Sequence, residues 1–195
     1  MKRIIAIIMA VSMLTTALAQ GVKGSWDEKA FKYTNSFHKI TWALPSEIAW
    51  TKIAASTPSI CFKAVNYESG VMLILNIKED QKYGNDAWTM YADMNSTEYK
   101  DYLKKSSRAA GVTLLSTDSA KSQLDGIHAI KKTSLIRKND PALGGEVDIL
   151  DITYLLCKDD KLYSVDMQAP NSLKSEVEGF DQIVNMIFKG VKFFK

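Results

Sequence analysis

The chain has 195 residues, of which 46% are hydrophobic and 24% are charged. This composition is typical of a globular protein and excludes a collagen-like or a disordered chain. A formal net charge of +3 gives no indication of affinity for nucleic acid, and we expect no nucleic-acid partner. The length fits one domain with a full hydrophobic core.

The N-terminus has the pattern of a secretory signal peptide. A basic start precedes the apolar run 4–19, which ends in the small-x-small motif Ala17-Leu18-Ala19. The run is shorter than the ~20 apolar residues of a transmembrane helix, and the residue after the motif is Gln20 rather than a lipid-accepting cysteine. We therefore expect residues 1–19 to be removed. The mature protein should be exported and soluble, periplasmic or secreted, with no transmembrane segment.

A change in composition divides the mature chain. Residues 20–36 are largely polar and contain two glycines, which predicts a flexible leader. A single domain is expected over residues 37–195. Its first strand is predicted around Ile40–Leu44, where apolar residues alternate and a proline follows. Strands at 59–65 and 71–77 should form a hairpin whose connection ends in glycine.

The rest of the chain predicts two amphipathic helical regions and further strands. Helical spacing continues from residue 87 to residue 110, with a new cap expected at Asn95. Strands are expected at 112–116, 127–136, 147–157 and 163–169, before a long closing helix that Gly190 ends and a last short strand. The order predicts an α+β fold, with a mostly antiparallel sheet in a layered α/β/α sandwich with two main helices.

Three segments carry a resemblance to a known family. They are an aromatic strand followed by Leu44-Pro45 and Trp50, the hairpin at 161–167, and the closing helix followed by Val191-Lys192-Phe193-Phe194. In this order the chain resembles the PsbP-like superfamily, which includes extrinsic photosystem proteins, Ran-binding proteins and small exported bacterial envelope proteins. The resemblance implies an α/β/α sandwich and a non-catalytic accessory or partner-binding role. It identifies no particular ligand.

The motifs of common catalytic and cofactor sites are missing from the sequence. His38 and His128 lie in no recognisable motif, and there is no Gly-x-Ser-x-Gly elbow. The spacing of cysteines and histidines does not suit zinc, and no glycine-rich loop suits a phosphate. We therefore expect no catalytic residue, metal or cofactor, and a protein partner. The alternative is a small exported hydrolase or ligand-binding module, which a pocket with convergent acid and histidine groups would favour.

Two further features leave alternatives open. Cys61 and Cys157 are an even pair in an exported chain, which permits a disulfide, but both lie in apolar runs where buried thiols are equally natural. Trp50 follows the loop that begins at Pro45. It is the candidate partner-binding residue if it is exposed there, and a core residue if it is tucked under the loop.

Overall fold

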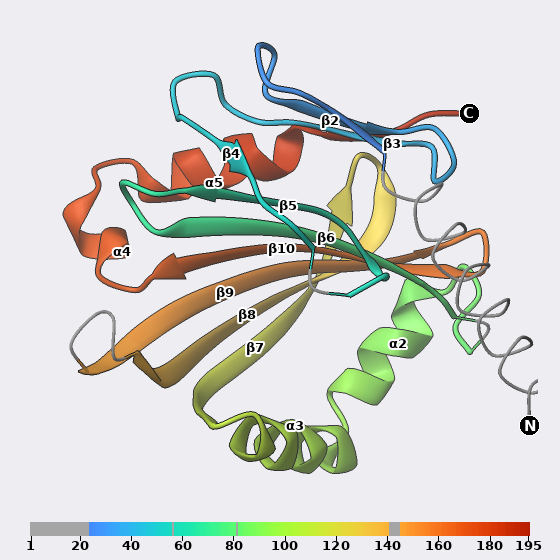
Figure 1. Cartoon of the computed structure of the whole chain (residues 1–195). Coiled ribbons are helices and arrows are strands. Elements are labelled where there is room, and N and C mark those ends of the chain that lie inside the picture. The colour runs from blue at the N-terminus through green and yellow to red at the C-terminus, as the bar shows by residue number, and fades with distance from the viewer. Residues whose placement is uncertain (1–23, 56, 81, 141–144) are drawn as a thin grey trace, which may run out of the picture.

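A computed structural model describes residues 24–55, 57–80, 82–140 and 145–195. The expected signal peptide, residues 1–19, lies outside the described residues. Within these ranges the chain forms two antiparallel sheets and four helices (Figure 1). The sheets and helices are stacked in layers, which confirms the predicted α+β class.

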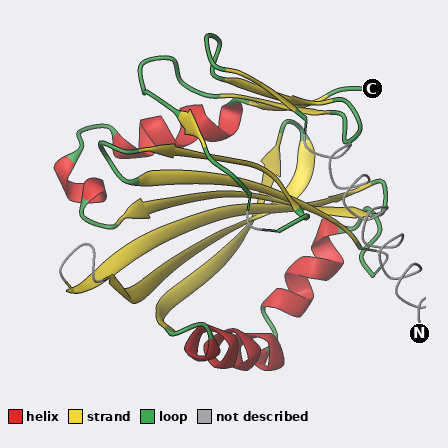
Figure 2. Cartoon of the chain, in the orientation of Figure 1, coloured by secondary structure: helices red, strands yellow, loops and turns green. Residues whose placement is uncertain are grey.

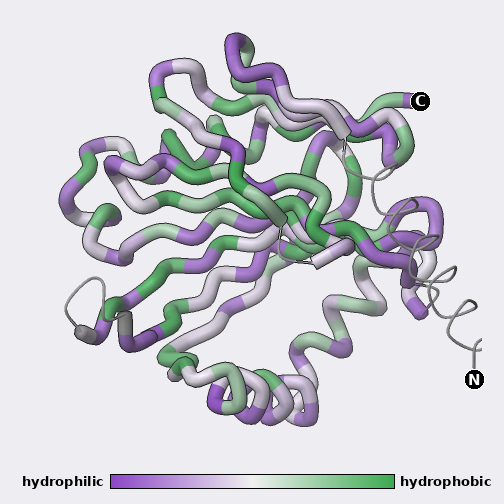
Figure 3. The backbone as a smooth tube through the Cα atoms, viewed as in Figure 1, coloured by the Kyte–Doolittle hydropathy of each residue, from purple (hydrophilic) through white to green (hydrophobic). Residues whose placement is uncertain are grey.

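The larger sheet forms the centre of the molecule. Its seven strands are, in spatial order, β4 (Thr51–Lys52), β5 (Ile60–Asn66), β6 (Val71–Glu79), β10 (Lys161–Pro170), β9 (Gly145–Lys158), β8 (Ile127–Asp140) and β7 (Val112–Leu124). Hydrophobic and hydrophilic residues alternate along its strands (Figure 3), so each of its two faces has its own character.

A smaller sheet and two helices cover one face of the large sheet. The small sheet has the order β1 (Ser25–Asp27), β2 (Lys32–Asn35), β3 (Ile40–Ala43) and β11 (Val191–Phe193). Beside it lie α4 (Leu173–Glu176) and α5 (Phe180–Lys189). The helices α2 (Ala87–Met94) and α3 (Thr97–Ala109) lie on the other side of the large sheet (Figure 2). We call the side with α2 and α3 the open face.

The expectation of a flexible leader over residues 20–36 is wrong for its described part. Residues 24–36 contain β1 and β2, which pair with each other and, through β2, with β3. Two aromatic rings fix these strands to the large sheet: the Tyr33 ring stacks on Phe62 with centroids 4.7 Å apart, and the Trp26 ring lies 5.1 Å from Phe62. Burial of these rings outweighs the polar composition of the segment.

The covered face of the large sheet contains the main core. Along β10, Tyr163, Val165, Met167 and Ala169 are at most 1% exposed, as their alternation predicts. Gly190, which connects α5 to β11, packs tightly against β3, and an added Cβ there would lie 1.8 Å from the carbonyl oxygen of Ala43. A larger side chain therefore has no room at this position.

The helices differ from the expectation in two places. The closing helix is two helices rather than one, because Gly179, with a φ of +72°, stands between α4 and α5. The expected cap at Asn95 is also wrong. Asn95 ends α2, and α3 is capped by Ser96, whose hydroxyl accepts a hydrogen bond from the Tyr99 amide at 3.2 Å.

Candidate functional site

Trp50 is buried, with 5% of its surface exposed. Its indole Nε1–H donates a hydrogen bond to the carbonyl oxygen of Pro45 at 3.2 Å, which satisfies the polar atom of the ring. Of the two alternatives for this residue, the geometry therefore agrees with the core tryptophan rather than with an exposed stacking surface. The ring nevertheless forms part of the wall of a surface cavity.

This cavity, which we call the Trp50 groove, has a volume of about 360 Å³. It lies between the 45–50 loop, the hairpin that joins β5 to β6, and the helices α4 and α5. Its floor is apolar and buried, formed by Trp50, Val71, Met167, Phe180 and Ile187. Its rim is apolar and half-buried, formed by Ile48, Leu173, Val177 and Ile183.

A few local interactions hold the walls of the Trp50 groove in place. The Asn66 side chain donates to the carbonyl oxygen of Ala49 at 2.9 Å and accepts from the Ser69 amide at 2.8 Å, so it ties the loop to the hairpin. On the opposite side, the break at Gly179 turns the chain so that Val177 and Ile183 both line the groove. Two hydrogen bonds thus fix the position of the loop relative to the hairpin on one side of the groove.

The charges that line the Trp50 groove are all negative. Glu47 and Glu68 line it and are exposed, and among the described residues no lysine, arginine or histidine lines it with them. An apolar cavity with two carboxylates at its edge can take an apolar side chain that has positive charges beside it.

A second cavity lies on the open face of the large sheet, between the sheet and the helices α2 and α3. We call it the open-face cavity, and its volume is about 490 Å³. Its floor carries polar side chains from four adjacent strands: Asn76 on β6, Ser164 and Asp166 on β10, Asp151 and Thr153 on β9, and Lys132 on β8. Aromatic and methionine side chains around α2 and α3 form its walls.

No sequence pattern marks these floor residues as a site. They are the alternate positions of strands whose other face is apolar, and such positions are usually solvated. The structure instead buries Asp151 and Thr153 and half-buries the others, and the loss of solvent raises the pKa of the Asp166 carboxyl to about 6. The pKa of Asp151 is also raised by burial, although Lys132, 3.9 Å away, opposes the shift. The floor residues are shielded because α2 and α3 lie over the open face, and the periodicity of the sequence does not predict where these helices lie.

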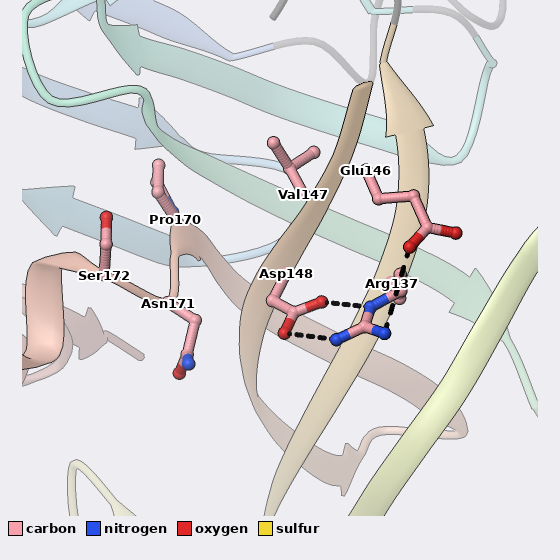
Figure 4. A pocket seen from close by; sticks show the side chains of 7 residues that line it. All are labelled: Arg137, Glu146, Val147, Asp148, Pro170, Asn171 and Ser172. Atoms are coloured by element: carbon pink, nitrogen blue, oxygen red, sulfur yellow. Dashed lines mark hydrogen bonds and ion pairs between the residues drawn. The ribbon is translucent and has the colours of Figure 1, made fainter. Parts of the chain in front are cut away.

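A third hollow, of about 520 Å³, lies beside Arg137 (Figure 4). The Arg137 guanidinium donates to both carboxylate oxygens of Asp148, at 2.7 and 3.1 Å, and Glu146 lies 3.9 Å away. This pairing lowers the pKa of Asp148. Because the cation is already held by two carboxylates, this hollow offers a ligand little free charge, and we assign it no role.

The two cysteines are free and buried in the structure. Cys61 belongs to the main core, whereas Cys157 lies on the open face beside Met90 and Met94. Burial raises the pKa of each thiol to about 11. The structure therefore agrees with the alternative of two buried, unreactive thiols and not with a disulfide.

The histidines do not complete an acid–base site. His38 is buried, and neither of its ring nitrogens has a hydrogen-bond partner among the described residues. His128 is exposed and its ring lies 4.7 Å from that of Trp88. Neither histidine lines the Trp50 groove or the open-face cavity. The convergence of acid and histidine groups that would favour a hydrolase is thus not found in the described part of the chain.

Comparison with solved structures identifies proteins that have a similar fold. The chain is similar to the solution structure of cyanobacterial PsbP (CyanoP) from Synechocystis sp. PCC 6803, with a TM-score of 0.55 and 12% identity over 88% of this chain and 96% of that one. A crystal structure from Bacteroides thetaiotaomicron matches with a TM-score of 0.50 and 10% identity, over 89% of this chain and 49% of that one.

The chain is also similar to the crystal structure of LpqN, involved in cell envelope biogenesis of Mycobacterium tuberculosis. The TM-score is lower, 0.48, with 10% identity over 80% of this chain and 83% of that one. No family model matches the sequence, and no curated protein matches it significantly. The similarities to the first two structures therefore concern the fold alone, and they agree with the fold that the resemblance implies. No helix in the described ranges has both the length and the apolar character needed to cross a membrane.

Proposed function

We propose that this chain, which has a PsbP-like fold, is an exported, non-catalytic accessory protein that binds a partner protein through the Trp50 groove. One observation carries the proposal: the groove combines a buried apolar floor with a rim of half-buried apolar side chains. Apolar surface of this kind gains about 25 cal/mol per Å² when a partner covers it. The Asn66 hydrogen bonds that tie the loop to the hairpin lower the cost of ordering this wall when a partner binds.

The residues at the edge of the groove specify the chemistry of the partner. Glu47 and Glu68 favour a segment in which lysine or arginine stands next to an apolar anchor residue. Trp50 acts as the fixed wall against which that anchor packs, and not as the anchor itself. This role keeps Trp50 in the binding site while explaining why the ring is buried.

Site-specific photo-crosslinking tests the proposed interface. p-Benzoylphenylalanine is placed at Val177, on the rim, and, as a matched control, at Met186, which is 50% exposed on α5 and does not line the groove. In the native host we expect a discrete crosslinked protein from Val177 and none from Met186. Equal crosslinking from both positions, or none from Val177, would refute the proposal.

Charge reversal provides a second variant that leaves the core untouched. Glu47 and Glu68 are exposed, so replacing both by Lys should preserve the melting temperature. We expect the crosslink from Val177 to be lost or strongly reduced in this variant. A crosslink of unchanged intensity would show that the acidic edge plays no part in recognition.

The proposal of export rests on residues 1–19 and has its own test. Mass spectrometry of the protein recovered from its host should give a mature N-terminus at Gln20, as the residue itself or cyclised to pyroglutamate. A folded protein that retains Met1 would contradict export through a cleaved signal peptide.

A further inference from the structure

The open-face cavity lies on the opposite face of the large sheet from the Trp50 groove and has no part in the proposed partner binding. Its floor holds two carboxylates and one cation. Lys132 approaches Asp151 at 3.9 Å, beyond hydrogen-bond distance, while no lysine or arginine of the described ranges forms an ion pair with Asp166. The edge of the cavity adds one charge of each sign, from Lys78 and Asp80. The lining therefore has one carboxylate more than it has cations.

The hydrogen bonds to the Asp166 carboxylate come from hydroxyl groups and not from a charged side chain. Ser164 Oγ lies 2.9 Å from each of the two carboxylate oxygens and shares its single proton between them. Thr153 also hydrogen-bonds to this carboxyl, and two hydroxyl donors still leave part of the acceptor capacity of a carboxylate unused. Burial is the main reason why the pKa of this group is raised to about 6, and the charge of Lys132 opposes the shift only in part.

A second acceptor in the same cavity has no donor at all. Asn76 stands directly opposite Ser164 in the pairing of β6 with β10. Its Oδ1 atom is buried and accepts no hydrogen bond from any described residue. A buried acceptor without a donor is costly, so the presence of Asn76 Oδ1 in the same cavity as Asp166 indicates a ligand that brings N–H groups.

The walls of the cavity suit the apolar part of such a ligand. Met90 and Met94 are buried on α2, and the rings of Tyr99 and Tyr102 on α3 lie 6.2 Å apart, with Tyr102 still largely exposed. Tyr83 lines the cavity from the segment before α2. Tyrosine rings attract organic cations through their π faces, and methionine side chains adapt to irregular apolar shapes.

We propose that the open-face cavity binds a small organic amine, whose protonated amino group donates hydrogen bonds to Asp166 and Asn76 and whose apolar part lies against the tyrosines. An ammonium group supplies the missing positive charge and three donors at once. A bare metal ion is a poorer match, because no three carboxylate, imidazole or thiol groups converge in the described ranges.

The test uses three probes of one shape and different charge, namely phenethylamine, phenethyl alcohol and phenylacetate, added to the folded mature chain. Binding is followed by the amide and side-chain NMR signals of Asn76, Tyr99 and Tyr102. We expect phenethylamine to bind at least about tenfold more tightly than the alcohol, and phenylacetate not to bind. Asp166→Asn should weaken the binding of phenethylamine by about tenfold or more, whereas Asp118→Asn, which alters an exposed residue on β7 and serves as the control, should leave the binding unchanged.

Each other outcome refutes a defined part of the proposal. Equal affinity for all three probes would show an apolar pocket without selection for an amine. No change in the signals of Asn76, Tyr99 and Tyr102 would show that this cavity is not a site. Unchanged affinity in folded Asp166→Asn protein would remove Asp166 from recognition. None of these results bears on partner binding at the Trp50 groove, because the two sites lie on opposite faces of the sheet.

Discussion

The buried Asp166 carboxyl predicts a stability that depends on pH in an unusual direction. Its pKa is about 6 in the folded protein, against an ordinary value of 3.8. Burial is the main cause and the charge of Asp151 adds to it, while hydrogen bonds from Thr153 and Ser164 and the charge of Lys132 oppose it. The folded chain therefore holds this proton more tightly than the unfolded chain does.

The sign and size of the effect follow from proton linkage. Because the folded state binds more protons between pH 3.8 and 6, the stability contributed by Asp166 is greatest below pH 3.8 and falls as the pH rises through 6. A shift of about two pH units corresponds to roughly 3 kcal/mol, since each unit is worth 1.36 kcal/mol. Replacing Asp166 by Asn removes the titrating group and keeps a side chain of the same shape.

The assay is equilibrium unfolding in urea from about pH 4 to pH 8 for the wild type and Asp166→Asn. Groups that titrate in both proteins contribute equally to the two free energies of unfolding and cancel in their difference. From about pH 4 to pH 8 the free energy of unfolding of the variant should therefore rise by up to about 3 kcal/mol relative to that of the wild type. Asp118→Asn, which alters an exposed carboxylate, should run parallel to the wild type. The reasoning would be refuted if the free energies of unfolding of the wild type and Asp166→Asn changed in parallel with pH. It would also be refuted if the wild type became more stable relative to the variant as the pH rises.

Three other predictions concern buried groups. Trp50→Ala should lower the free energy of unfolding by about 3–5 kcal/mol, measured by denaturant titration, because it removes a core aromatic ring. Cys61 and Cys157 should resist a thiol reagent in the folded state and react as two equivalents after unfolding, and a reductant should not shift the melting temperature. Gly190→Ala should destabilise the fold by roughly 3 kcal/mol in the same titration, because the new methyl group meets the Ala43 carbonyl oxygen. A loss below about 0.5 kcal/mol would contradict that clash.

The sequence predicted the fold best where apolar residues repeat along one element. The alternation from Tyr163 to Ala169 identifies both a strand and its buried face, because the period of a strand is fixed by backbone geometry. The segment with Trp26 and Tyr33 was missed for the opposite reason. Each of its short strands has a single large aromatic ring, and that is too few for a period to emerge.

The sites were harder to predict than the elements because they depend on packing between elements. The pattern around Trp50 is compatible with either burial or exposure, and the Asn66 hydrogen bond that closes the loop comes from a different hairpin. Asp151 and Asp166 occupy positions that the alternation assigns to the outside of the core. Only the placement of α2 and α3 turns that outer face into a cavity, and no local pattern contains this information.

The pairing of β3 with β11 has a consequence for the order in which the molecule can form. The Trp42 indole donates to the carbonyl oxygen of Ile187, 145 residues further along the chain, and Val191 pairs with Trp42 in the small sheet. Contacts between residues so far apart in the sequence form late in folding, because closing the long loop between them costs conformational entropy. The small sheet that covers the main core therefore cannot be completed before residues 187–193 have been synthesised.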